Sequence, residues 1–360
     1  MTPSSQTKIE RLFFWGRPFS PLYSFLMAKR SSLYEKNIFK RHKLEVPVIS
    51  VGNLVLGGTG KTPLVHYIAK LLKKKNKRPA ILSRGYKGAS TGPINIVSDG
   101  NNILIDAEQA GDEPRLLAEK LPGVPIITGK KRSITGRFAI DTYGVSCLIL
   151  DDGFQHMSLM RDLDLVLFSA EKLLENNRVL PGGFLREPLT ALKRADAFII
   201  SGVKRPDDSR ITEFINYLHD LFPDTPVFTG TYQPDEKIYR MSAGNNDTIS
   251  IAECRKIPVY GFCGIAQPES FYNLLRNNGL NVVGFESFDD HHAYSLDNIK
   301  SLCENGLSCG AQALITTEKD LVKVRALLPQ DLPLLTLGLK LQMDKSFDHF
   351  LLRSLENFRI

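Results

Sequence analysis

Short apolar runs alternate with stretches of helical spacing along most of the chain. The runs occupy residues 46–51, 80–83, 145–150, 164–170 and 196–202, and apolar residues recur at helical spacing from Pro63 to Leu72. Apolar strands that alternate with helices are typical of a mostly parallel sheet with helices on both faces. Such sheets bind ligands at the carboxyl ends of their strands, so the polar residues that follow the runs are the first candidates for a site.

A second series of elements begins after an interruption. Residues 223–245 are rich in Pro, Gly, Asn and Asp. Beyond them, the pattern predicts strands at 257–262, 281–285 and 312–316, helices after Pro268 and at 296–306, then one strand over 332–343 and a final helix. We therefore expect an α/β fold with a basic segment over 1–43, a larger core over 44–228, a linker over 229–243, a smaller α/β lobe over 244–330, and a return strand and C-terminal helix over 331–360.

The first 43 residues carry the excess positive charge of the chain. They hold nine Lys and Arg residues against two Glu, whereas the remainder holds 37 basic and 37 acidic side chains. This even balance over most of the chain argues against a nucleic-acid partner. The apolar runs of the basic segment are far shorter than the roughly 18 to 20 residues that span a bilayer, and the segment has no secretory signal pattern.

The basic segment is expected to form an amphipathic helix. Ser20 is a candidate N-cap before Pro21. Leu22, Leu26 and Leu33 fall on one stripe with basic residues at its edges. Such a helix either lies on a membrane, where Lys and Arg meet anionic headgroups, or packs on the core of its own protein. The pattern alone supports both interpretations.

The five cysteines are scattered along the chain. They form no CxxC pair, and no histidine lies at metal-ligand spacing from them. We expect free thiols in a reducing compartment and no structural zinc.

The stretch "GNLVLGGTGKTP" (52–63) has the parts of a phosphate-binding loop. Such a loop needs inward-facing backbone N–H groups at the start of a helix, a lysine and a hydroxyl. These parts are supplied by Gly57, Gly58, Thr59, Gly60, Lys61 and Thr62. Val55 stands where the Walker A pattern has a glycine, which alters the start of the loop but not the cradle. We expect Lys61 to bridge the β and γ phosphates and Thr62 to hold Mg²⁺.

A buried strand ends in two acids, Asp151 and Asp152, either of which would complete a metal site beside the loop. Gln155 and His156 follow, and they either face the site or cap the next turn. The basic turn "TGKKRSITGR" (128–137) faces either phosphates or solvent.

Three more polar clusters lie in predicted loops: "GDEP" with Asp112 and Glu113, "LPGGFLREP" with Arg186 and Glu187, and "DDHHAY" with Asp289, Asp290, His291 and His292. A phosphotransferase needs a base near the acceptor hydroxyl and cations around the transferred group. A paired Asp and His would supply such a base.

Two classes of P-loop protein fit poorly. A GTPase carries N-K-x-D, and the nearest match, "TTEKD" (316–320), has Glu318 in place of the lysine. A partitioning-type ATPase has a second lysine where this chain has Leu56. A Mg-ATP kinase that acts at a membrane surface agrees with every feature. The alternative is a membrane-associated NTPase switch or another small-molecule kinase.

Eight motifs, in order, resemble the tetraacyldisaccharide 4'-kinases of lipid A biosynthesis. They are "VPVISVGNLVLGGTGKTP", "SRGYKG", "GDEP", "LDDGFQH", "LPGGFLREP", "GIAQPESF", "FDDHHAY" and "TTEKD". The resemblance covers nearly the whole chain. It implies transfer of the γ-phosphate of ATP, with Mg²⁺, to the 4'-hydroxyl of tetraacyldisaccharide 1-phosphate, which gives lipid IVA. It also implies a P-loop core and a smaller lobe joined by a two-stranded linker, at the cytoplasmic face of the bacterial inner membrane.

The resemblance also implies roles for single residues. Lys61 and Thr62 match the loop contacts, and Asp151 and Asp152 match the acids near the metal. Asp112 and His291 resemble the catalytic pair of the family, in which the Asp is the base and the His supports it. Residues that resemble those lining the cleft are Arg132, Gln155, Arg186 and Glu187. Whether His292 can replace His291 stays open.

A lipid acceptor favours the membrane interpretation of the basic segment. The acceptor leaves a bilayer at a cost of roughly 0.8 kcal/mol for each buried CH₂, so the enzyme must come to it. We expect a peripheral or monotopic membrane protein that acts as a monomer. The loop departs from the family at Val55-Leu56, where Thr-Val is common.

Overall fold

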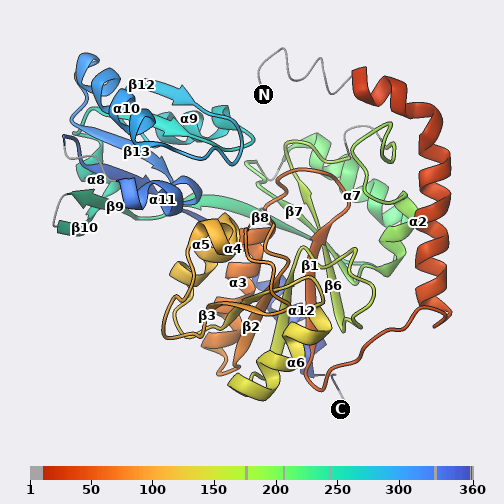
Figure 1. Ribbon diagram of the computed structural model, residues 1–360. Coiled ribbons are helices and arrows are strands. Elements are labelled where there is room, and N and C mark those ends of the chain that lie inside the picture. Colours follow the sequence, from red (N-terminus) through yellow and green to blue (C-terminus); the bar gives the residue numbers. More distant parts are fainter. Residues whose placement is uncertain are drawn as a thin grey trace. The chain divides into compact units, whose positions relative to one another are not determined.

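The chain forms two compact units in the computed structural model, which describes residues 11–86, 88–174, 177–205, 207–242, 245–327, 331–356 and 358 (Figure 1). The larger unit comprises Thr2–Tyr232 and Leu341–Ile360, and the smaller unit comprises Gln233–Lys340. The chain passes from one unit to the other inside two strands, β8 (Val227–Pro234) and β15 (Leu339–Met343). The smaller unit thus extends beyond the expected range of 244–330 on both sides.

The larger unit is built on a sheet that has nine strands within the described residues. In order of pairing, they are β15, β8, β7 (Ala197–Ser201), β6 (Leu163–Ser169), β1 (Val48–Asn53), β5 (Cys147–Asp151), β2 (Pro79–Ser83), β4 (Ile126–Thr128) and β3 (Asn95–Ser98). The strands from β8 to β4 run parallel, and β3 runs antiparallel to β4 at the edge. The carboxyl ends of the parallel strands therefore lie along one edge of the sheet.

Helices cover both faces of this sheet, as Figure 1 shows. Alternate residues of β1 explain why: Ile49 and Val51 are buried on one face, and Val48 on the other. The first face packs against α3 (Lys61–Lys74), α5 (Asp112–Lys120) and α12 (Lys345–Glu356). The second packs against α6 (Arg132–Tyr143), α7 (Ser209–Leu221) and the 3-10 helix η2 (Leu189–Arg194). A sheet that is buried on both faces accounts for the nearly continuous apolar runs in the sequence.

The smaller unit has a sheet of six strands among the described residues. In order of pairing, they are β10 (Asn245–Ser250), β9 (Lys237–Ser242), β14 (Leu334–Leu337), β13 (Ala313–Thr317), β11 (Val259–Cys263) and β12 (Val282–Ser287). The strands from β14 to β12 run parallel, and β9 runs antiparallel to both β10 and β14. Short α8 (Ile251–Cys254) and α9 (Pro268–Asn277) pack on one face, and α10 (Leu296–Ser308) and α11 (Glu318–Val324) on the other. The predicted α/β class is confirmed in both units.

The predicted strand over 332–343 is wrong, because the structure divides it. β14 ends at Leu337 and belongs to the sheet of the smaller unit, whereas β15 begins at Leu339 and joins the sheet of the larger unit. Gly338 lies between them, where a Cβ would meet the side-chain carboxylates of Asp235 and Glu318. The interrupted stretch over residues 223–245 likewise forms strands, since it contains all of β8 and all of β9.

The N-terminal helix α2 (Ser20–Glu35) follows a 3-10 turn, η1 (Arg17–Phe19). Ser20 was predicted to be its N-cap, and this is wrong: Ser20 is already helical and its side chain does not cap the helix. Its hydroxyl donates to the Val179 carbonyl (2.8 Å) and accepts from the Gly182 N–H (2.9 Å). Ser20 therefore fixes the start of α2 to the larger unit.

Candidate active site

Four neighbouring strands bring most of the predicted site residues of the larger unit to one edge of its sheet. β1 leads into the glycine-rich loop, β5 ends at Asp151, β2 leads into "SRGYKG", and β4 leads into the turn before Arg132. These strands are adjacent in the order β1, β5, β2, β4, and all are parallel. Motifs far apart in the sequence therefore meet at one place.

The loop itself has room for an anion at its glycines. A side chain built on Gly57 or Gly58 would meet no protein atom within 4 Å, and both residues are exposed. Lys61 and Thr62 form the first turn of α3, where backbone N–H groups are not bonded within the helix. Open glycines at a helix N-terminus are the arrangement that binds phosphate.

Two residues that were not predicted from the sequence, Ser201 and Tyr232, contact the loop. The Ser201 hydroxyl, at the end of β7, donates to the Thr59 carbonyl at 2.7 Å. Tyr232, in β8, lies against Gly60, and Gly60 has φ of +82°. Thr59 is buried, and its hydroxyl has no hydrogen-bond partner among the described residues. A polar residue at the end of a buried strand, as in "FIIS", is a weak signal for such a support.

The unusual Val55 has a structural explanation. It forms an antiparallel bridge with Leu185, and the Val55 side chain is buried with Leu185 in one apolar cluster. Flanking hydrogen bonds join the Leu56 N–H to the Phe184 carbonyl and the Arg186 N–H to the Leu54 carbonyl, both at 2.8 Å. The first residues of the loop thus act as a short strand that carries Arg186 to the site.

Asp152 lies among cations. Lys61 Nζ is 3.5 Å from its carboxylate, and Arg186 Nη1 donates to its two oxygens at 3.0 and 2.9 Å. Burial by itself raises the pKa of Asp152, but the charges of Lys61, Arg186 and Arg132 outweigh it and hold the pKa below its usual value. Asp152 is therefore a stable anion beside the phosphate loop.

Asp151 has a contrasting environment. Its side chain is 2% exposed, and burial raises its pKa, as does the nearby carboxylate of Glu113, while Lys61 acts in the opposite direction. One carboxylate oxygen accepts from Ser83 at 3.3 Å, and the other has no hydrogen-bond donor among the described residues. A buried carboxylate with an unused oxygen favours a cation as its partner.

Two of the predicted cleft residues contact this pair of acids or their neighbours. Arg132, 3% exposed, donates to the Asp151 carbonyl at 2.8 Å, so the basic turn directs this side chain inward. Gln155 donates to the Asn53 carbonyl (3.0 Å) and accepts from Arg186 (3.3 Å). Gln155 therefore faces the site.

Glu187 has a different position from Arg186. Its side chain is 1% exposed and accepts from Arg194 Nη2 at 3.0 Å. The guanidinium of Arg194 also lies 4.5 Å from the centre of the Phe154 ring and donates to the Ser31 hydroxyl of α2. Glu187 therefore lies in a buried ion pair with Arg194, and its expected place in the cleft stays a prediction.

His156 is held uncharged. Burial, followed by the charges of Arg132, Arg161 and other arginines, lowers its pKa to about 3. Its Nε2 lies 3.3 Å from the Ser158 hydroxyl, and its backbone N–H closes a turn onto the Gly153 carbonyl. At neutral pH His156 is a neutral part of the turn and not a source of protons.

The inner face of α2 bonds to the same motifs. Arg30 donates to the Gln155 carbonyl at 3.2 Å, and the Tyr23 hydroxyl donates to the Arg186 carbonyl at 3.4 Å. Its other face leaves Leu22, Phe25 and Leu26 exposed. The helix thus packs on the protein with one face and presents apolar side chains with the other, and whether this outer face lies on a membrane stays a prediction.

Asp112 is the first residue of α5. Gly111 before it has φ of +89° and lies against the Tyr86 carbonyl, where a side chain would overlap. The Ala89 N–H also donates to the Glu108 carbonyl at 2.9 Å. The "GDEP" motif is thus held against the "SRGYKG" loop, at the edge where Glu113 acts on Asp151.

His291 belongs to the smaller unit. It lies in a turn with φ of +65°, and its backbone N–H donates to the Gly264 carbonyl at 3.1 Å. Its Nε2 is 3.2 Å from Lys319 Nζ. The neighbouring His292 is half-buried and packs between the rings of Phe288 and Tyr294, at the edge of the apolar core of this unit.

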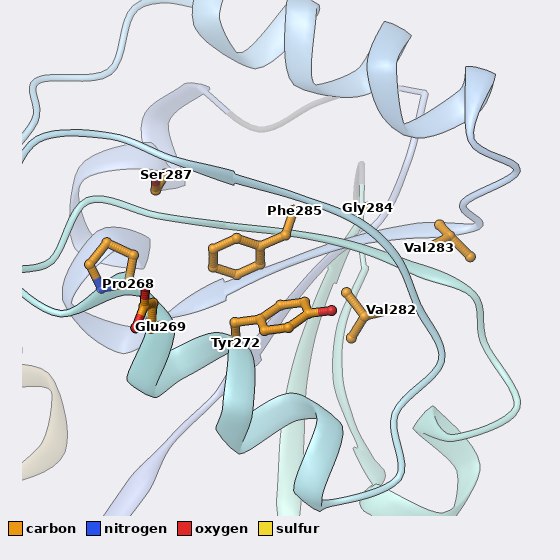
Figure 2. A pocket seen from close by; sticks show the side chains of 8 residues that line it. All are labelled: Pro268, Glu269, Tyr272, Val282, Val283, Gly284, Phe285 and Ser287. Carbon is orange, nitrogen blue, oxygen red and sulfur yellow. The ribbon is translucent and has the colours of Figure 1, made fainter. Parts of the chain in front are cut away.

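A surface hollow of about 430 Å³ lies between α9 and β12 in the smaller unit. Figure 2 shows the rings of Tyr272 and Phe285 along it, with Pro268 and Glu269 at one end. The two rings are 5.2 Å apart in an edge-on arrangement. None of the predicted site residues lines this hollow.

Known proteins match this chain over nearly its whole length. The family described as LpxK, tetraacyldisaccharide-1-P 4'-kinase, matches residues 12–356. A tetraacyldisaccharide 4'-kinase of Desulfotalea psychrophila is 45% identical over 98% of this chain and 99% of its own. The chain belongs to this kinase family. A tetraacyldisaccharide 4'-kinase of Syntrophus aciditrophicus, 37% identical over 94% of this chain and 92% of its own, agrees with this membership.

A solved structure of the family supports the fold. The "apo" form of LpxK from Aquifex aeolicus in complex with ATP superposes with a TM-score of 0.73 at 33% identity, and covers 94% of this chain and 98% of its own. The family, the P-loop kinase fold, the phosphotransferase class and ATP as nucleotide, all predicted from the sequence, are confirmed.

Proposed function

We propose that this chain transfers the γ-phosphate of ATP to the 4'-hydroxyl of tetraacyldisaccharide 1-phosphate, which gives lipid IVA. The observation that carries the proposal is the meeting of the phosphate loop with Asp152, whose carboxylate lies 3.5 Å from Lys61 Nζ. Lys61 would neutralise charge on the β and γ phosphates, and the N–H groups from Gly57 to Thr62 would hold their oxygens. Family membership supports the choice of acceptor.

Thr62, Asp151 and Asp152 would hold Mg²⁺. The unused, buried oxygen of Asp151 fits this ion, because Mg²⁺ prefers oxygen ligands and offsets a buried negative charge. No group of three or more His, Cys, Asp or Glu residues is gathered as a metal site in the described parts of the chain. The remaining ligands would therefore be phosphate oxygens and water, as is usual for Mg²⁺. When bound, the ion supplies neutralisation of the phosphate charge during transfer.

Asp112 would be the base for the acceptor hydroxyl. The 4'-oxygen attacks the γ-phosphorus, the bond to the β,γ-bridging oxygen breaks, and the hydroxyl proton passes to the Asp112 carboxylate. His291 would support this carboxylate. Arg132, Gln155 and Arg186 would line the cleft.

The outer face of α2 would bind the membrane. Its exposed apolar side chains include Leu22 and Phe25, 60% and 62% exposed, and Trp15 before the helix is 76% exposed. Exposed basic residues at its edges, such as Lys29 and Lys36, would meet anionic lipid. No helix in the described part of the chain is long and apolar enough to cross a bilayer. We therefore propose peripheral or monotopic binding at the cytoplasmic face of the inner membrane, as a monomer.

The proposal is tested with Asp112→Ala and His291→Ala. Each should lower kcat by at least about 10²-fold, the usual contribution of acid–base catalysis, while the Kd for ATP stays within about threefold of the unmodified protein. The matched controls are Asp224→Ala and His219→Ala, which change exposed residues of the same types in the larger unit. Near-normal turnover in either test variant would refute the role of that residue.

A further inference from the structure

Lys319 lies beside the imidazole of His291 in the smaller unit. Its Nζ is 3.2 Å from His291 Nε2 and 3.0 Å from an oxygen of Asp290. The nearer contact of Asp290 is with Lys319, since the closest approach of its carboxylate to His291 Nε2 is 3.9 Å. The ammonium group of Lys319 is therefore nearer to Nε2 than the Asp290 carboxylate is.

This contact determines which nitrogen of the ring carries the proton. An ammonium group has three N–H donors and no acceptor, so it can only donate to His291 Nε2. A neutral imidazole has one N–H and one acceptor nitrogen. When Nε2 accepts from Lys319, the proton must be on Nδ1.

One helix holds both the ring and the backbone of this turn. Lys319 is in the first turn of α11, and the next residue, Asp320, is fully buried. Asp320 accepts from the Gly264 N–H at 3.0 Å, and the Gly264 carbonyl accepts from the His291 N–H at 3.1 Å. The position of Lys319 relative to His291 is therefore fixed by the fold.

The adjacent histidine has the opposite arrangement. His292 Nε2 lies 3.1 Å from Asn298 Oδ1, and this oxygen also accepts from the Ser295 N–H at 3.1 Å. An oxygen cannot donate, so His292 Nε2 must carry the proton. His292 is thus an internal reference for His291.

We propose that Lys319 is a positioning residue that holds His291 in the Nδ1–H tautomer. The effect of this tautomer on catalysis rests on the proposed function, in which His291 supports the carboxylate of Asp112. A carboxylate base can only accept hydrogen bonds, so the supporting imidazole must offer it an N–H. Lys319 ensures that the N–H is on Nδ1, as the second nitrogen of a catalytic histidine commonly sets the tautomer of the first.

The tautomer is measured by ¹⁵N NMR on the full chain labelled at histidine, at a pH where imidazoles are neutral. His291→Gln identifies the His291 signals. The unmodified protein should show an unprotonated Nε2 in His291 and a protonated Nε2 in His292. Lys319→Met should shift His291 toward the Nε2–H tautomer, whereas Lys319→Arg, which keeps a cationic donor, should retain the original one. Lys300→Met, which changes an exposed lysine of α10, is the matched control.

The spectrum also reports whether each variant is folded, because His292 must keep its own tautomer. An unchanged His291 signal in folded Lys319→Met, or a protonated Nε2 in the unmodified protein, would overturn the proposal. If Lys319→Met does not fold, loss of the Nδ1–H tautomer in folded Lys319→Arg would overturn it instead.

Kinetics separate this inference from the proposed function. Lys319→Met should lower kcat by tenfold or more without changing KM for ATP, and Lys319→Arg should restore most of the rate. If the tautomer changes as expected but His291→Ala keeps normal turnover, the positioning of His291 by Lys319 stands and the catalytic role of His291 is refuted.

Discussion

Tyr232 occupies the space that a side chain on Gly60 would need. A Cβ on Gly60 would overlap the Tyr232 hydroxyl oxygen, whereas a Cβ on Gly58 would meet no atom within 4 Å. Gly60 also has φ of +82°, which other residues rarely adopt. The fold therefore favours glycine at position 60, whereas we predict that position 58 needs glycine to leave space for ATP.

Alanine at these two glycines should separate folding from ATP binding. Gly60→Ala should lower the free energy of unfolding by about 1 to 3 kcal/mol from backbone strain, besides the effect of the overlap with Tyr232. Gly58→Ala should leave the unfolding midpoint unchanged and weaken ATP binding at least tenfold. Thermal unfolding and calorimetric titration with Mg-ATP measure the two quantities. A stable Gly60→Ala protein, or unchanged ATP affinity in Gly58→Ala, would contradict this division.

Asp151→Asn should stabilise the ligand-free protein, and it should reduce the further stabilisation that Mg-ATP gives. Burial raises the folded-state pKa of Asp151 above 3.8, so folding disfavours its charged form, and the stability of the unmodified protein falls as the pH rises from 3.8 toward the raised value. The variant, which has no charge here, should therefore gain about 1 to 3 kcal/mol at neutral pH. Its Tm should rise less than that of the unmodified protein when Mg-ATP is added. Asp224→Asn is the control, and a loss of stability in ligand-free Asp151→Asn would show that the charge is not disfavoured.

His156→Gln should reduce the loss of folding stability as the pH falls below neutral. The folded-state pKa of His156 is lowered to about 3, so its contribution is complete above the unfolded value of 6.5 and is lost as the pH falls below it. Unfolding by urea at pH 7.5 and at pH 5.5 measures the difference. The unmodified protein should lose more stability between the two pH values than His156→Gln does. Equal losses would mean that His156 titrates normally in the folded protein.

Substitution of apolar residues on the outer face of α2 by polar ones should release the protein from lipid vesicles. Burying one large apolar side chain contributes about 1.5 to 3 kcal/mol, so the combined change Leu22→Gln, Phe25→Gln and Leu26→Gln should weaken binding well over tenfold. This change leaves Arg30 and Tyr23 on the inner face intact, which deletion of the helix would not. The control combines Leu104→Gln, Leu221→Gln and Leu307→Gln, three other exposed leucines. Unchanged sedimentation with vesicles that contain anionic lipid would refute membrane binding by this face.

Local sequence was sufficient for the parts of the site that depend on backbone geometry or on strand ends. Gly57, Gly60 and Lys61 follow directly from the needs of a phosphate loop after an apolar strand. Asp151 and Asp152 follow from the position of two acids at the end of another strand. Because parallel strands end at one edge of a sheet, their meeting was predictable from the pattern.

Other parts of the site depend on residues that are distant in the sequence. Val55 lies in a bridge with Leu185, 130 positions away, and no local pattern indicates this pairing. Arg30 and Arg194 belong to different elements and contact the site motifs only after folding. The division of 332–343 into two strands has the same origin, because β14 and β15 pair with different sheets and Gly338 has to accommodate Asp235.

The central claim is tested most directly by following phosphate from [γ-³²P]ATP in mixed micelles that contain tetraacyldisaccharide 1-phosphate. The product is then examined by ³¹P NMR for the position of the new phosphate. We predict one new phosphomonoester at the 4'-position, Mg²⁺-dependent, together with little release of free phosphate. Hydrolysis of ATP at the same rate with and without the lipid, and no label in the lipid, would contradict the account and favour an NTPase switch.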